Sequence, residues 1–175
     1  MSAGSTPLTL VMKGHGRFRR ALPPARIAFV GAVLWAAAMS TSAAIVLATD
    51  AWESPARIRT VALLFAGGGS IGFPLGLFLA RLLAEGRRPE TAFAAALLAF
   101  AATTIAATGA FYALQYRSYY AEWHAEAFTI TWLLQFVFTG LAALYQFAVL
   151  GLRLYFPVGF FSLFVAAWWF ARQAR

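Results

Sequence analysis

The chain contains no cysteine. This absence excludes disulfides, thiolate metal centres, iron–sulfur clusters and cysteine nucleophiles. Charge is also scarce, because only 11% of the 175 residues are Asp, Glu, Lys or Arg. A soluble domain of this size covers one apolar core with a charged surface, and this composition cannot supply such a surface.

Carboxylates and histidines are also missing from the apolar stretches of the chain. The two histidines, His15 and His124, both lie in polar segments. Ion-coupled transporters and proton relays normally place an ionisable group at membrane depth, and bis-histidine haem needs histidines inside the spans. The sequence therefore disfavours these activities, and we expect neither a cofactor nor a bound metal.

Long apolar stretches make up most of what is present, with 62% of residues apolar. Four of the five stretches hold about 20 or more residues, the length that an α-helix needs to cross roughly 30 Å of hydrocarbon. We predict an all-α, polytopic transmembrane helical bundle with four spans and a fifth, C-terminal span. A basic arm, residues 1–25, precedes a transmembrane domain, residues 26–175. The predicted spans cover residues 26–48, 60–83, 91–114, 128–150 and 154–171.

The last of these stretches allows two interpretations. Pro157 interrupts the apolar run and suits the first turn of a new helix. Residues 154–171 are barely long enough to span, and the alternative lays them in the membrane interface with Trp168 and Trp169 in an aromatic belt. We favour the span.

The distribution of basic residues predicts the orientation, because Lys and Arg stay on the cytoplasmic side. With a cytoplasmic N-terminus, nine basic residues including Arg153 lie inside, against Arg57, Arg59 and Arg117 outside. The chain then ends outside, after the fifth span. A single lysine among 14 basic residues indicates GC-rich codons and hence a bacterial inner membrane. The sequence shows no basic surface interleaved with aromatic residues that could stack bases, so we expect no nucleic-acid partner.

Small residues recur at every fourth position in the first two spans. Gly68, Gly72 and Gly76 share one face of the second span, and Ala36 and Ser40 share one face of the first. Faces of this kind let helix backbones approach closely in a membrane. We predict tight helix packing there, against a helix of this chain or of another.

Polar residues form a stripe on the fourth span. Gln135, Thr139 and Gln146 follow at helical spacing, and the same face continues to Arg153. Amides inside a membrane need a polar partner, so this stripe faces protein or a polar cavity. It either lines a polar pocket or forms hydrogen bonds between helices, and we favour hydrogen bonds.

The outer loops hold one set of residues with possible chemistry. His124 lies between Glu122 and Glu126, and Asp50 is expected on the same side. Such a set could act in acid–base chemistry on lipid headgroups. On a helix, however, the two glutamates would point away from His124, so a metal site is not predicted.

Taken together, these patterns favour a non-enzymatic integral membrane protein. We expect an accessory or assembly subunit of a larger bacterial membrane complex, which acts through helix–helix packing. Its expected partners are the lipid bilayer and other membrane subunits. The alternative is a small-molecule transporter or substrate-binding membrane component that uses the polar stripe, and a headgroup enzyme ranks third.

Overall fold

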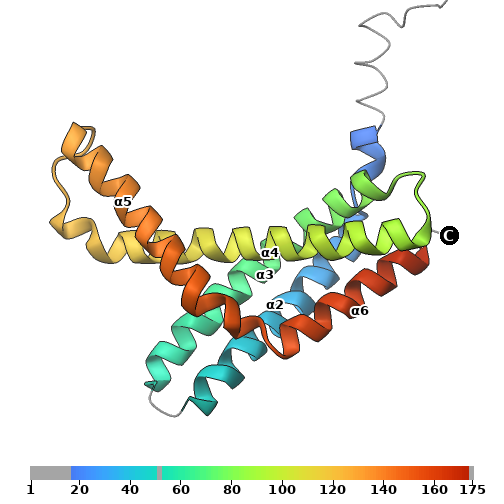
Figure 1. The fold of residues 1–175 in the computed structure, drawn as a ribbon, viewed down its shortest axis with the longest axis horizontal. Helices are drawn as coiled ribbons and strands as arrows, with labels where there is room; N and C mark the ends of the chain where they lie inside the picture. Colours follow the sequence, from blue (N-terminus) through green and yellow to red (C-terminus); the bar gives the residue numbers. More distant parts are fainter. Residues whose placement is uncertain (1–16, 51–52, 174–175) are drawn as a thin grey trace, which may run out of the picture.

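The computed structural model describes residues 17–50 and 53–173, and these residues are helical with no strand among them (Figure 1). The long helices are α2 (Ala25–Thr49), α3 (Pro55–Ala84), α4 (Pro89–Tyr120), α5 (Ile130–Gln146) and α6 (Val158–Gln173). Four segments are long and apolar enough to cross a membrane: Ala25–Thr49, Pro55–Ala84, Pro89–Trp123 and Ile130–Tyr155. The predicted all-α membrane-spanning bundle is confirmed, and the protein is an integral membrane protein.

Local capping sets the helix boundaries. Helix α3 begins with Pro55, and the Ser54 hydroxyl accepts a hydrogen bond from the Arg57 N–H at 3.3 Å, as expected of an N-cap serine. Helix α4 also begins with a proline, Pro89. Between α3 and α4, Gly86 turns the chain with a φ of 70°, a conformation that favours glycine. Hydropathy alone placed the start of the second span at residue 60 because it does not register these caps.

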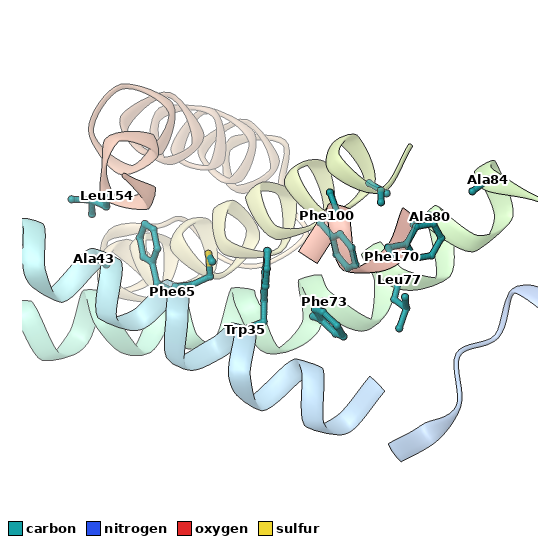
Figure 2. Packing of buried hydrophobic residues seen from close by; sticks show 14 of the residues in the cluster. Trp35, Ala43, Phe65, Phe73, Leu77, Ala80, Ala84, Phe100, Leu154 and Phe170 are labelled. Carbon is teal, nitrogen blue, oxygen red and sulfur yellow. The ribbon is translucent and has the colours of Figure 1, made fainter. Parts of the chain in front are cut away.

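Helices α2, α3 and α4 form the core of the molecule. Helix α3 packs against both α2 and α4. Trp35, Phe73 and Phe100, one from each helix, meet with ring centroids 5.2–5.9 Å apart (Figure 2). Such separations are favourable for aromatic pairs, so the three rings stabilise the centre of the bundle.

The last apolar stretches bend rather than form one straight helix. Helix α5 packs against α4 and extends away from α2, α3 and α6 (Figure 1). A π-helical turn, η2 (Phe147–Gly151), and a 3₁₀ turn, η3 (Leu152–Tyr155), follow it. Helix α6 then runs back along α4 and α2.

The predicted side of Arg153 is wrong. Its guanidinium pairs with the Asp50 carboxylate at 2.8 Å, so it lies at the end of α2 and not at the turn between α3 and α4. Helix α6 instead returns to that turn, where Gln173 lines a cavity together with Arg81 and Gly86. The prediction failed because the sequence did not show the turns η2 and η3, after which Arg153 reaches the end of α2.

The described part of the basic arm lies beside the turn between α3 and α4. Residues 1–16 lie outside the described residues, and 17–21 form a short helix. Arg17 binds Glu85, at the end of α3, with a distance of 2.9 Å between Nε and Oε2. The arm thus joins the bundle before α2 begins.

Candidate functional site

The glycine face of α3 packs against α4 of the same chain. A Cβ added to Gly68 would lie 2.6 Å from the Cα of Thr108, and one added to Gly72 would lie 2.7 Å from the Cα of Thr104. A Cβ on Gly76 would come within 3.0 Å of the Phe100 Cα. Because this face is buried within the chain, it is not available to a partner subunit.

Thr103 adds a hydrogen bond to this contact. Its hydroxyl donates to the Gly72 carbonyl of α3 at 2.7 Å. The hydroxyl is also 2.8 Å from the Ala99 carbonyl of its own helix. The glycines therefore allow both close packing and a polar contact between α3 and α4.

On α2, the structure places the predicted packing residues at the rim of the contact. Ala36 faces Gly69, whose added Cβ would lie 3.1 Å from the Ala36 Cα. Ser40 is half-buried, whereas Ser42 is buried and its hydroxyl accepts from the Gly159 N–H of α6 at 3.2 Å. The sequence could not show the partner of Ser42, because Gly159 is more than 100 residues away in the chain.

The polar stripe of α5 is used within the chain. Gln135 Oε1 accepts from the Ala125 N–H at 2.8 Å, and Thr139 Oγ1 lies 3.2 Å from His124 Nε2. Both partners belong to the segment between α4 and α5. The stripe therefore joins α5 to the turn that precedes it.

Gln146, at the end of the stripe, binds α4 itself. It accepts from the Tyr112 hydroxyl and donates to the Tyr116 hydroxyl, at 3.4 Å in each case. The two tyrosines are one helical turn apart, a spacing that could have indicated a shared partner. Arg153 does not join the stripe, because the turns η2 and η3 rotate it toward Asp50.

The outer acid–base set is not assembled. His124 contacts Thr139 of α5, while Asp50 pairs with Arg153, which follows α5. Glu122 is exposed. Within residues 17–50 and 53–173, no group of three His, Asp or Glu side chains could hold a metal ion.

Aromatic side chains gather around the turn between α4 and α5. The Arg117 guanidinium lies 4.4 Å from the centre of the Phe136 ring, within the range of a cation–π contact. Tyr and Trp concentrate where a membrane meets water. Tyr119, Tyr120, Trp123 and Trp132 make ring contacts there. We therefore expect the turn at a membrane–water interface, with α5 leading from it into the apolar layer.

The outer face of α5 has no partner among the described residues. Within α5, described in full, Ala143 is the buried residue. Only 11% of the apolar window of this candidate span is buried, against 28–44% in the other three. Gly140 has nothing within 4 Å of an added Cβ. We define the α5 outer face as Gly140 and its exposed neighbours Leu133, Leu134, Val137, Phe138, Leu141 and Leu144.

Three cavities lie elsewhere in the described part of the chain. The largest, about 1000 Å³, is an apolar groove between α2 and α6, with Arg26 and Trp169 in its wall. A second, about 270 Å³, lies between α4 and α6 beside Trp35. The third, about 380 Å³, lies among charged residues at the turn between α3 and α4. The polar stripe lines none of the three.

Comparison with known proteins gives no relative. The chain matches no protein-family model, no curated protein and no solved structure.

Proposed function

We propose that this protein is a non-enzymatic accessory or assembly subunit of a membrane complex, and that the α5 outer face binds a helix of a partner subunit. The observation that carries the proposal is the low burial of α5: Ala143 alone is buried in this helix of 17 residues. The exposed residues of the helix can contact another molecule in the membrane.

The polar residues of α5 support this role. Gln135, Thr139 and Gln146 all bind within the chain, so they fix α5 to α4 and to the turn between the two helices, and leave an apolar outer face. Membrane helices associate through small residues that let backbones approach. Gly140 provides such a point, with open space beside it.

The membrane side follows from the basic residues, as part of the same proposal. Eight of the twelve arginines among the described residues belong to one end of the molecule, formed by the short helix before α2, the start of α2, the last turn of α3 with the turn that follows it, and the end of α6. Basic residues concentrate on the cytoplasmic side. We therefore place this end in the cytoplasm, with the protein in a bacterial inner membrane.

The transporter alternative ranks second. It depended on a pocket at the polar stripe, and these side chains bind Ala125, His124 and two tyrosines instead. The groove between α2 and α6 offers a transporter an apolar surface in place of a polar path.

Site-specific photocrosslinking in native membranes tests the proposal. A photoreactive residue at Leu141, on the α5 outer face, should give one discrete protein adduct whose partner can be identified by mass. Leu98 of α4 provides the control, because it is similarly exposed but lies on another helix. Gly140→Leu should abolish the Leu141 adduct and leave the chain folded, since a Cβ added at this position meets no atom within 4 Å. Lipid adducts alone at both positions would refute the proposal.

A further inference from the structure

Four arginines from three segments surround the cavity of about 380 Å³ at the turn between α3 and α4. Arg17 and Arg20 come from the short helix before α2, Arg81 from the last turn of α3, and Arg87 from the turn itself. Pockets for small ligands begin at about this size. Retention of arginines on the cytoplasmic side requires no cavity, so the convergence calls for a separate explanation.

The charges around this cavity are not balanced. Glu85 is the one carboxylate in its wall, and it binds two of the arginines, Arg17 at 2.9 Å and Arg20 at 3.1 Å. Arg81 donates to the Leu22 carbonyl at 3.1 Å, a neutral acceptor. One negative charge therefore faces four positive ones.

The surroundings of the cavity are partly apolar. Phe170 and Gln173 of α6 form one wall, and Ala21 and Ala84 lie beside the arginines. The cavity lies where three candidate spans begin or end, at the depth at which a membrane displays its headgroups. A ligand with a charged head and an apolar tail suits such a place.

From this geometry we propose that the cavity binds the phosphate group of an anionic membrane lipid. Guanidinium groups bind phosphate oxygens through paired hydrogen bonds, and basic pockets between membrane helices accept anionic headgroups. Arg81 and Arg87 bind the phosphate directly. Glu85 holds Arg17 and Arg20 at the rim and competes with the phosphate for them.

Lipid titration of the purified full-length chain tests this site. The chain is placed in phosphatidylcholine nanodiscs with increasing phosphatidylglycerol, and its thermal unfolding is followed. Phosphatidylglycerol should raise the Tm of the wild type, and Arg81→Gln/Arg87→Gln should remove at least nine-tenths of that increase. The matched control is Arg57→Gln/Arg59→Gln, which changes two arginines at the other end of α3. This variant should keep the increase in Tm that phosphatidylglycerol produces.

Two further measurements separate this site from a structural role. Arg87→Gln alone should weaken the lipid effect several-fold, in case the double variant fails to fold. Glu85→Gln should lower the Tm in phosphatidylcholine because ion pairs are lost, yet enlarge the increase that phosphatidylglycerol produces. If Arg81→Gln/Arg87→Gln and Arg57→Gln/Arg59→Gln reduced the phosphatidylglycerol-dependent increase in Tm equally, the proposal would be overturned. An equal, arginine-dependent increase with inorganic phosphate alone would overturn the lipid as the source.

Discussion

Trp35 connects three helices through one side chain. Its indole Nε1 donates to the Thr104 hydroxyl of α4 at 2.9 Å, in a buried position. Its ring meanwhile packs against Phe73 of α3 and Phe100 of α4. A buried N–H needs a partner, so the hydrogen bond and the packing depend on the same side chain.

We expect Trp35→Phe and Thr104→Val to be coupled. Each single change leaves one buried polar group unpaired, which costs about 1–3 kcal/mol of the free energy of unfolding. The double change removes both groups, so it should cost less than the sum, by about 0.6–2 kcal/mol for a hydrogen bond between membrane helices. Unfolding titrations in mixed micelles would measure the four variants. Strictly additive losses would show that the hydrogen bond contributes nothing.

At the scale of the element, the contact between α3 and α4 requires glycine at one position. We expect Gly72→Ala to lower the free energy of unfolding by about 1–3 kcal/mol, the usual cost of overpacking, because the new Cβ lies 2.7 Å from the Thr104 Cα. Backbone cannot move aside as a side chain can. Thermal unfolding in detergent would measure the loss.

Gly140→Ala is the matched control for this change. Its added Cβ meets nothing within 4 Å, and alanine favours a helix over glycine by roughly 1 kcal/mol. The variant should therefore be neutral or slightly stabilised. If both alanines had the same effect, close packing at Gly72 could not be the cause.

Hydropathy was enough to predict the fold class, because lipid requires long apolar helices. It could not predict the course of α5 and α6. Residues 128–171 are apolar on nearly every side, so no face marks which neighbour each helix contacts. The turns η2 and η3 and the pair Arg153–Asp50 depend on contacts far apart in the chain.

The polar stripe was only partly predictable, because helical spacing shows which residues share a face but not what they bind. Spacing placed Gln135, Thr139 and Gln146 on one helical face, and the structure shows all three bonded on the side toward α4 and its turn. Their partners were not predictable. Ala125 contributes a backbone N–H, which no side-chain pattern reveals.

At the scale of the whole molecule, the fold fixes which ends lie together. A cysteine-free chain permits single-cysteine labelling without background. In intact cells, a membrane-impermeant maleimide should label Ala56→Cys, at the start of α3. Glu90→Cys and Gln173→Cys should react only after permeabilisation, because α6 returns to the turn between α3 and α4.

The pattern of labelling separates fold from orientation. If Glu90→Cys and Gln173→Cys react in intact cells while Ala56→Cys does not, the fold stands and the proposed cytoplasmic side is reversed. If Gln173→Cys reacts together with Ala56→Cys, the placement of α6 is wrong.

Because α4 is long, bilayer thickness should affect how this helix, and α5 with it, lies in the membrane. Its 32 residues rise about 48 Å, whereas the hydrocarbon layer is about 30 Å thick. Helix α4 must therefore tilt, or extend its last turns among the headgroups. Because Gln146 binds α4 through Tyr112 and Tyr116, a change in that tilt carries α5 with it. A thinner membrane would thus reorient the α5 outer face, and lipid chain length would regulate what that face can meet.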